Sequence, residues 1–224
     1  MLKGGRIDGD HLFIVVALYG QRGPLSAVRL ALVTAPAAAT RPTAADLAAA
    51  RDRTLPDLVG PGLRVLFSGI NPSLYSAATG CHFARPGNRF WPALHGSGFT
   101  TRQLRPSEQQ SLLSSGLGIT NVVARATARA DELTAAELRA GGEALGLLVA
   151  RLGVPFLAVL GVTAYRAAFG VPGAVVGPQS LRLSGAQVWV LPNPSGLNAS
   201  WQMPRLAEAF RELREAADTG IPGA

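Results

Sequence analysis

Four short runs of apolar residues dominate the pattern of hydrophobic and polar positions along this chain. The run at 64–68 is nearly continuous, which is typical of a parallel strand buried on both faces. The runs occupy residues 64–68, 118–123, 156–160 and 187–191. They predict strands of one central sheet.

Between these runs the apolar residues recur at helical spacing. The longest such segment, residues 134–152, begins with Thr134 and has Glu137 three positions on, the pattern of a capping box. Shorter helices are predicted at residues 43–53, 88–96, 107–114, 163–169 and 204–217. Strands that alternate with helices predict an α/β fold: a three-layer α/β/α sandwich with a short, mainly parallel central sheet.

The first part of the chain has a different character. Residues 1–54 combine Gly and Arg patches, a weak apolar run at 12–18 and a Pro/Ala-rich stretch. We expect an N-terminal extension over 1–54 that is in part foreign to the natural protein and dispensable up to about Arg41, an α/β domain over 55–217, and a tail over 218–224. A basic arm that adds non-specific DNA affinity is the alternative for the extension.

Charge and composition narrow the possible partners. The formal net charge is +7, which permits a polyanionic partner such as nucleic acid. Nearly all of the positive charge comes from arginine, since Lys3 is the only lysine, and the chain is rich in alanine. A biased base composition of the gene would produce the same residue usage, so the charge alone does not identify a nucleic-acid partner. The single cysteine, Cys81, excludes an intrachain disulfide and a Cys-ligated zinc or iron–sulfur site within the chain. We expect no metal and no cofactor.

No run of eighteen apolar residues occurs, and two aspartates precede the apolar run at 12–18 where a secretory signal would be basic. We therefore expect no membrane partner and a cytoplasmic protein.

Two Asn-Pro turns carry the candidate chemistry. Residues 69–74 read Gly-Ile-Asn-Pro-Ser-Leu and follow the first apolar run; residues 193–198 read Asn-Pro-Ser-Gly-Leu-Asn and follow the last. In open α/β sheets, ligands bind where the carboxyl ends of strands meet. Asn offers one acceptor and one donor pair without charge. The pattern predicts two halves of one site, although two simple turns remain an alternative on this pattern alone.

A long segment rich in small residues, 75–91, follows the first turn. Loops of this length in compact domains are usually functional. Phe83 stands among small residues and is our candidate for stacking on a planar ligand, whereas Phe90 and Trp91 are expected in the core.

At this point the residues resemble a known family, the mismatch-specific uracil-DNA glycosylases and thymine-DNA glycosylases of the uracil-DNA glycosylase superfamily, in particular the bacterial mismatch-specific type. The first motif carries the likeness, and so does the second motif, Asn193-Pro194-Ser195-Gly196-Leu197. The other matching positions are Ser76-Ala77, Thr79-Gly80, Phe83-Ala84, Pro86, Asn88-Arg89-Phe90-Trp91, Gly141-Gly142, Leu160-Gly161, Ala164-Tyr165 and Trp189-Val190-Leu191-Pro192.

The resemblance implies a monofunctional DNA N-glycosylase of base-excision repair. Such an enzyme flips uracil mispaired with guanine out of double-stranded DNA and hydrolyses its bond to deoxyribose, leaving an abasic site. Thymine and ethenocytosine are further candidate bases, and the sequence leaves their ranking open. The resemblance also implies a monomer that works on the nucleoid.

The resemblance also implies a functional role for each residue that matches the family motifs. Asn71 would hold the attacking water. Ile70, Ser76, Phe83 and Asn193 would form the base pocket, with Asn193 standing where uracil-specific relatives use a histidine. Leu197 would be the wedge, flanked by Gly196 and Asn198 at the opposite guanine. The groups expected at the DNA backbone are Arg85, Arg89, Arg125 and Ser195.

Several positions depart from the family pattern. The departures are Ser73, Tyr75, Cys81-His82, Ala124 and Asn198. Cys81 and His82 directly precede Phe83, so these two departures are expected to affect which bases the pocket selects. A weakly catalytic damaged-DNA or nucleotide-binding module is the competing hypothesis, and Asn71 argues against it. A small-molecule enzyme is disfavoured because no Ser-His-Asp set, paired carboxylates or Gly-rich phosphate loop accompanies the motifs.

Overall fold

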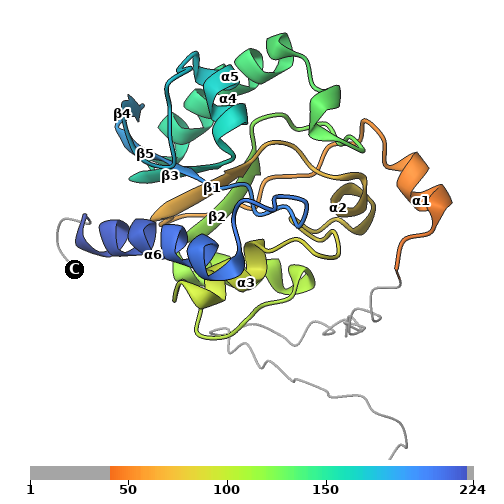
Figure 1. The fold of residues 1–224 in the computed structure, drawn as a ribbon, viewed down its shortest axis with the longest axis horizontal. Helices are drawn as coiled ribbons and strands as arrows, with labels where there is room; N and C mark the ends of the chain where they lie inside the picture. Colours follow the sequence, from red (N-terminus) through yellow and green to blue (C-terminus); the bar gives the residue numbers. More distant parts are fainter. Residues whose placement is uncertain (1–40, 221–224) are drawn as a thin grey trace, which may run out of the picture. The chain divides into compact units, whose positions relative to one another are not determined.

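The computed structural model describes residues 41–220; residues 1–40 and 221–224, and with them most of the expected N-terminal extension, lie outside the described residues. Within the described part, a five-stranded sheet forms the centre of the molecule (Figure 1). Its spatial order is β2-β1-β3-β5-β4. The strands are β1 (Val65–Gly69), β2 (Leu117–Asn121), β3 (Phe156–Leu160), β4 (Gly177–Leu183) and β5 (Ala186–Leu191).

Neighbouring strands are parallel throughout except for β4, which pairs antiparallel with β5 at one edge. The four predicted apolar runs correspond to β1, β2, β3 and β5. The sequence prediction missed β4 because this edge strand, Gly-Pro-Gln-Ser-Leu-Arg-Leu, is mostly polar and only partly buried.

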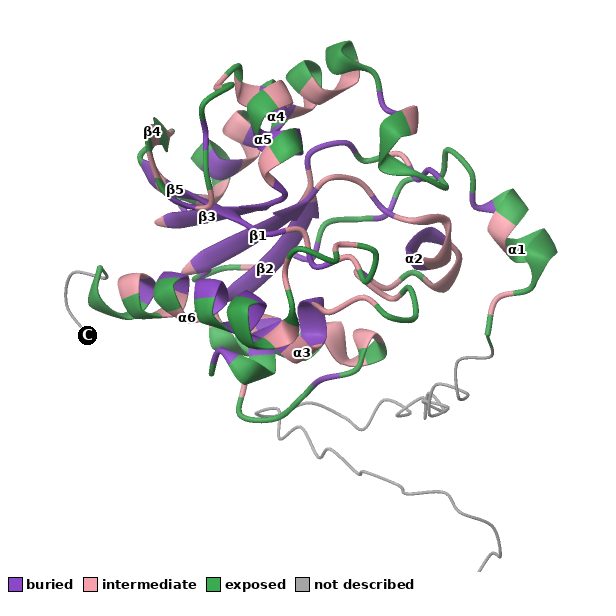
Figure 2. Ribbon diagram, viewed as in Figure 1, coloured by how far each residue is buried: buried purple, intermediate pink, exposed green. Residues whose placement is uncertain are grey.

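Alternate side chains of the strands serve two separate core layers. Val65 and Phe67 of β1 point to one layer and Leu66 to the other, as the period of a strand requires. The first layer is covered by α3 (Phe90–Gly96), α6 (Met203–Thr219) and the 3₁₀ segment η1 (Pro106–Ser115), and the second by α4 (Ala135–Leu152) and α5 (Val162–Phe169). Figure 2 shows the buried strands between the half-exposed helices. The predicted three-layer sandwich with a mainly parallel sheet is confirmed.

Local signals explain the helix boundaries. Thr134 caps α4 with its side chain, and Glu137 completes the predicted capping box. Gly170, with a φ of 65°, ends α5. The predicted helix at 107–114 is present as the 3₁₀ segment η1. Phe90 and Trp91 are 0% and 3% exposed, which confirms their expected place in the core.

Two glycines let α4 lie close to its neighbours. A Cβ on Gly141 would come within 2.2 Å of the Val122 carbonyl oxygen, and one on Gly142 within 2.6 Å of that of Ala168. Any larger residue there would force α4 away from the loop after β2 and from α5.

The described end of the predicted extension packs on the domain. Thr43 caps the short helix α1 (Ala44–Ala49), as predicted, with Asp46 completing a capping box. Ala50 is fully buried in a small cluster with Ala77 and Ala126, and the Asp52 amide donates to the Ala126 carbonyl at 3.0 Å. Residues 41–54 are therefore in contact with the loops that follow β1 and β2.

Between residues 41 and 220, no helix has the length and apolar character needed to cross a membrane.

Candidate active site

The loops after β1, β2 and β5 enclose one cavity of about 600 Å³. Both Asn-Pro motifs line it, as predicted from their places after parallel strands. Of the predicted site residues, those on the cavity wall are Ile70, Asn71, Ser76, Phe83, Arg85, Asn193, Ser195 and Leu197. Arg89, Arg125, Gly196 and Asn198 are not part of this wall.

The side chain of Asn71 is held in one orientation. Its amide nitrogen Nδ2 donates to the Arg125 carbonyl at 3.0 Å and to Thr127 Oγ1 at 2.7 Å. The Thr127 hydroxyl donates in turn to the Arg129 carbonyl at 2.6 Å, so its lone pair is the part that faces Asn71. Since both donors of the amide are engaged, Oδ1 of Asn71 is left as an acceptor toward the cavity.

Thr127 is a functional candidate that the sequence prediction missed. It lies 56 positions after Asn71 and is only 2% exposed. An isolated bridge pairs Ser73 with Thr127, and the Thr127 amide donates to the Pro72 carbonyl at 3.2 Å. No local signal marks such a residue, because its role depends on two loops meeting in space.

A short helix, α2 (Leu74–Thr79), begins at the last residue of the first motif and continues into the segment predicted to be a loop. Ser73 Oγ accepts from the Ser76 amide at 3.1 Å and so caps the helix. This local task accounts for serine at a position that departs from the family pattern. Ser76 itself is 3% exposed, and its Oγ accepts hydrogen bonds from the Ser73 hydroxyl and, at 3.2 Å, from the Ala84 amide.

Phe83 adopts an unusual backbone conformation. Its φ is 52°, a left-handed value that costs a non-glycine residue on the order of 1–3 kcal/mol. The ring stacks on Phe90 at a centroid distance of 4.1 Å, and the Phe83 amide makes no hydrogen bond with the described residues. Phe83 lines the cavity and has an unbonded amide, which suits contacts to a flat, polar-edged ligand.

The second motif forms a compact turn. Asn193 Oδ1 accepts from the Ser195 amide at 2.9 Å, and Asn198 Nδ2 donates to the Asn193 carbonyl at 3.0 Å. The Nδ2 group of Asn193 has no partner among residues 41–220 and is available to the cavity. Asn198, another departure from the family pattern, thus ties its own turn together.

Arg89 is built into this turn. Its guanidinium donates to the carbonyls of Ser195, Asn198 and Trp201, and its amide donates to the Pro194 carbonyl. These bonds join the first residues of α3 to the loop before α6. These hydrogen bonds give the Arg89 guanidinium a holding role inside the protein, and its contact with DNA phosphates stays a prediction.

Leu197 stands at the outer tip of the turn, with 81% of its surface exposed. The backbone beside it lies close to the loop before α3, since a Cβ on Gly196 would come within 2.6 Å of the Gly87 carbonyl oxygen. Exposure alone assigns Leu197 no role, because Leu147 and Val175 are also exposed apolar side chains. The place of Leu197 at the mouth of the cavity suits the predicted wedge.

Arg125 is also engaged within the protein. Its guanidinium donates to Glu137, to Asp52 at 3.0 Å and to the Glu132 carbonyl at 3.2 Å. The Arg125 guanidinium, aided by the Thr134 cap, lowers the pKa of Glu137 to about 2. Arg125 therefore anchors the loop whose carbonyl binds Asn71, and a phosphate contact by this side chain is not favoured.

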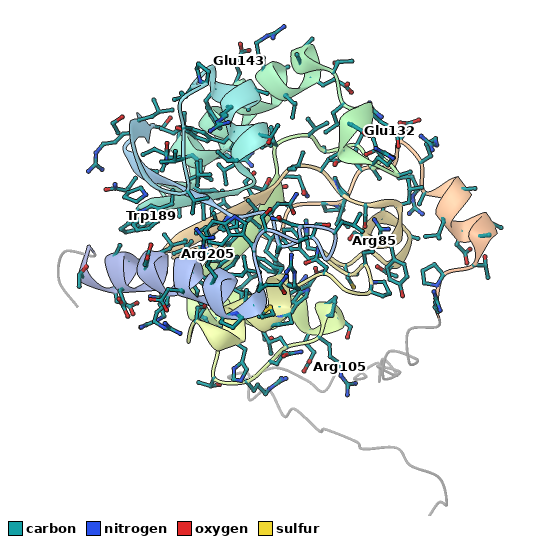
Figure 3. All side chains as sticks on the ribbon, in the orientation of Figure 1. Arg85, Arg105, Glu132, Glu143, Trp189 and Arg205 are labelled. Carbon is teal, nitrogen blue, oxygen red and sulfur yellow. The ribbon has the colours of Figure 1, made fainter. Side chains whose placement is uncertain are left out.

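Arg85 has a different setting. It is exposed, lines the cavity and forms no ion pair with the described residues. Figure 3 shows Arg85 among the loops beside α2. It remains the best placed of the three predicted arginines for a DNA phosphate.

Asn121, at the carboxyl end of β2, also lines the cavity. It is paired in register with Gly69, and a Cβ on that glycine would come within 2.5 Å of Asn121 Oδ1. The sequence reasoning treated the surrounding run only as a strand and passed over this residue.

Between residues 41 and 220, no group of three or more His, Cys, Asp or Glu side chains is arranged to hold a metal ion.

The chain is similar to known proteins in two respects. A family model described as the uracil DNA glycosylase superfamily matches residues 56–216. Among solved structures, the chain is similar to the solution NMR structure of a candidate uracil DNA glycosylase from Methanosarcina acetivorans, at 18% identity and a TM-score of 0.49, covering 73% of this chain and 98% of that one. The matched range of the family model includes both motifs and every residue on the cavity wall described above.

Proposed function

Because the chain belongs to the uracil DNA glycosylase superfamily, a family of DNA glycosylases, we propose that it excises uracil mispaired with guanine in double-stranded DNA. The proposed reaction is hydrolysis of the bond between base and deoxyribose, which leaves an abasic site. Thymine and ethenocytosine opposite guanine are further candidate substrates.

The orientation of Asn71 carries this proposal. Its Nδ2 is bound by the Arg125 carbonyl and Thr127 Oγ1, so that Oδ1 is the atom offered to the cavity. A water that donates to this oxygen would be held in one place relative to a flipped nucleotide. A binding module would have no need of such a fixed acceptor.

The chemistry asked of Asn71 is positional. An amide is not a base at neutral pH, so Asn71 orients the water and does not remove its proton. The transition state is an oxocarbenium-like sugar, which attracts even a neutral water once it is correctly placed. We therefore expect slow turnover that depends on the leaving-group quality of the base.

Asn193 would assist the departing base. Its Oδ1 is occupied by the Ser195 amide, which leaves Nδ2 to donate to an oxygen on which negative charge develops. A neutral amide stabilises such charge less than a charged donor would. The enzyme should then depend on substrates whose bases are already easy to extrude, as mismatched bases are.

The exposed Leu197 would fill the gap that the flipped nucleotide leaves in the duplex. Phe83 would stack on the extruded base, and its free amide would contact the base edge together with Ser76. Gly196 and Asn198, on either side of the wedge, would contact the orphaned guanine. Arg85 would contact a phosphate at the rim. We propose a monomer that acts in the cytoplasm on the nucleoid.

A single-turnover cleavage panel tests the proposal. Duplexes carrying uracil, thymine or ethenocytosine opposite guanine, and uracil opposite adenine, are incubated with excess enzyme, and abasic sites are scored by alkaline strand scission. We expect uracil opposite guanine to be released faster than uracil opposite adenine. Equal rates on the two uracil duplexes would remove mismatch selectivity, and no release from any duplex would leave the binding module as the better description.

A further inference from the structure

His82 is a buried histidine on the wall of the cavity, and the mechanism above does not use it. It is 2% exposed. Its ring nitrogen Nε2 lies 3.0 Å from the Pro56 carbonyl oxygen. The residue directly precedes the stacking candidate Phe83, and the two rings are 6.4 Å apart between centroids.

The contact with Pro56 fixes which ring nitrogen carries the proton. A carbonyl oxygen only accepts, so Nε2 must be the N–H donor. Burial lowers the pKa of His82 from its usual value, opposed in part by the Pro56 carbonyl and by the charge of Asp57. The ring is therefore neutral near pH 7, and its other nitrogen, Nδ1, is an unprotonated acceptor.

Nδ1 makes no hydrogen bond with the described residues. The enclosed side-chain nitrogens and oxygens that lack a partner within residues 41–220 are Arg89 Nε, Tyr165 OH and Trp189 Nε1, and His82 Nδ1 is not among them. Because Nε2 is bound by Pro56 and His82 lines the cavity, Nδ1 is the ring nitrogen available to a group bound there.

Ser76 offers the complementary group on the same wall. Its Oγ already accepts from the Ser73 hydroxyl and the Ala84 amide, so its own hydrogen is free to donate. The cavity thus presents an acceptor at His82 and a donor at Ser76, both buried and both held by neighbouring backbone. A ligand edge with one N–H and one carbonyl oxygen would satisfy the two groups.

We propose that His82 is a specificity-determining residue whose Nδ1 accepts the ring N–H of a flipped uracil or thymine. Both bases carry an imide N–H beside a carbonyl oxygen, whereas ethenocytosine has no N–H on its base at all. A buried acceptor left without a donor lowers affinity for the unmatched ligand. The cavity therefore favours imide bases over the etheno adduct, an inference that rests on the proposed function and refines its substrate range.

Two substitutions separate this role from a structural one. His82→Gln can keep an N–H donor for the Pro56 carbonyl but removes the acceptor at the Nδ1 position. His82→Asn can keep an acceptor at that position but loses the bond to Pro56. If His82 only held its loop to Pro56, His82→Asn would be the more damaging change for every substrate.

The test is the single-turnover rate of each variant on uracil and on ethenocytosine, both opposite guanine. Dividing each rate by that of the unchanged protein on the same duplex cancels the different leaving-group qualities. We expect His82→Gln to lose about tenfold on uracil and less than about twofold on ethenocytosine, the effect of one hydrogen bond. His82→Asn should reduce both rates by similar factors. An equal loss on both bases for His82→Gln would overturn the inference.

Binding keeps the inference testable if no base is released. Affinity is measured for duplexes carrying the non-cleavable 2′-fluoro analogue of deoxyuridine or of ethenodeoxycytidine, each against a duplex with an abasic analogue. Selective weakening of the uracil analogue in His82→Gln, without turnover by the unchanged protein, would sink the proposed function and retain the His82 role. If the uracil analogue gains nothing over the abasic duplex, both fail. Cleavage with unaltered selectivity in His82→Gln sinks the His82 role alone.

Discussion

The two Asn-Pro loops line the same cavity but are built in opposite ways. In the first, the side chain of Asn71 is bound by a carbonyl and a buried hydroxyl that come from more than fifty positions further along the chain. In the second, the internal bonds hold the backbone of the turn, and Leu197 at its tip is 81% exposed. One loop fixes an atom, and the other presents an apolar surface.

This difference matches two physical tasks. A water-positioning group must stay within a fraction of an ångström of its working position, so it needs support from the surrounding fold. A wedge must instead enter a duplex, so its side chain must be free while its backbone is held. We infer that the first loop serves the chemical step and the second serves extrusion of the base.

Removal of the Asn71 side-chain oxygen should have the largest effect and tests whether the first loop serves the chemical step. Asn71→Ala should lower the single-turnover rate on a guanine–uracil duplex by roughly two or more orders of magnitude, because the water loses its acceptor. Specific binding of the duplex, measured by fluorescence anisotropy, should persist. A wild-type cleavage rate would contradict the assignment.

Loss of the hydrogen bond from Asn71 to Thr127 should have the second-largest effect on the cleavage rate. Thr127→Val keeps the size of a buried side chain but removes the oxygen that accepts from Asn71 Nδ2. We expect about a tenfold loss of single-turnover rate, equivalent to one charge-free hydrogen bond that positions the amide. Thr127→Ser, which retains the hydroxyl, is the matched control and should stay near the wild-type rate. If both variants cleave equally well, Thr127 does not position Asn71.

The loss of rate on removing the Leu197 side chain should depend on how well the target base is paired. Leu197→Ala should slow uracil release several-fold opposite guanine and more strongly opposite adenine, because a mispaired base is easier to unstack by about a few kcal/mol. The comparison needs single-turnover rates on the two duplexes under identical conditions. Equal losses on both would argue against a wedge.

A smaller effect is expected for Arg85, at the rim of the cavity, on the salt dependence of DNA binding. Duplex binding should weaken with salt as counterions are displaced, and Arg85→Ala should reduce the slope of log affinity against log salt by about 0.9, the effect of one phosphate contact. Arg151→Ala, at the far end of α4, is the matched control for loss of one charge. An unchanged slope in Arg85→Ala would place its guanidinium away from the phosphates.

The smallest effect concerns stability and pH. Arg125 and the Thr134 cap lower the pKa of Glu137 to about 2, so the carboxylate's contribution to stability is complete above its ordinary pKa of 4.5 and is lost as the pH falls toward 2. Glu137→Gln should therefore show a shallower fall in melting temperature between pH 4.5 and 2 than the unchanged protein. If the melting temperatures of the two proteins fall equally between pH 4.5 and 2, the ionised Glu137 does not contribute to stability as proposed.

Sequence reasoning succeeded where the signal is local. Short apolar runs predicted β1, β2, β3 and β5, and cap residues predicted the start of α4 at Thr134 and the end of α5 at Gly170. The edge strand β4 was missed because a half-exposed, mostly polar strand has no continuous run to detect. Helix α2 was missed because its serine cap and small residues also fit a loop.

The site could be predicted only in part, because partners far apart in sequence decide which groups are free. The motifs predicted that Asn71 and Asn193 would share a cavity, and they do. Their spacing gave no sign that Arg89 and Arg125 would be engaged inside the protein, or that Thr127 and His82 would have polar atoms at the wall. Such roles follow from loops that meet at the end of the sheet.

One measurement tests the division of labour between the two loops most directly. A guanine–uracil duplex with 2-aminopurine beside the uracil is mixed rapidly with enzyme, and the fluorescence rise on base extrusion is recorded together with abasic-site formation. We predict that Asn71→Ala gives a wild-type fluorescence rise with almost no base release, whereas Leu197→Ala gives a diminished rise. If Asn71→Ala abolishes the fluorescence rise, or releases uracil at the wild-type rate, the two loops do not divide extrusion and chemistry in this way.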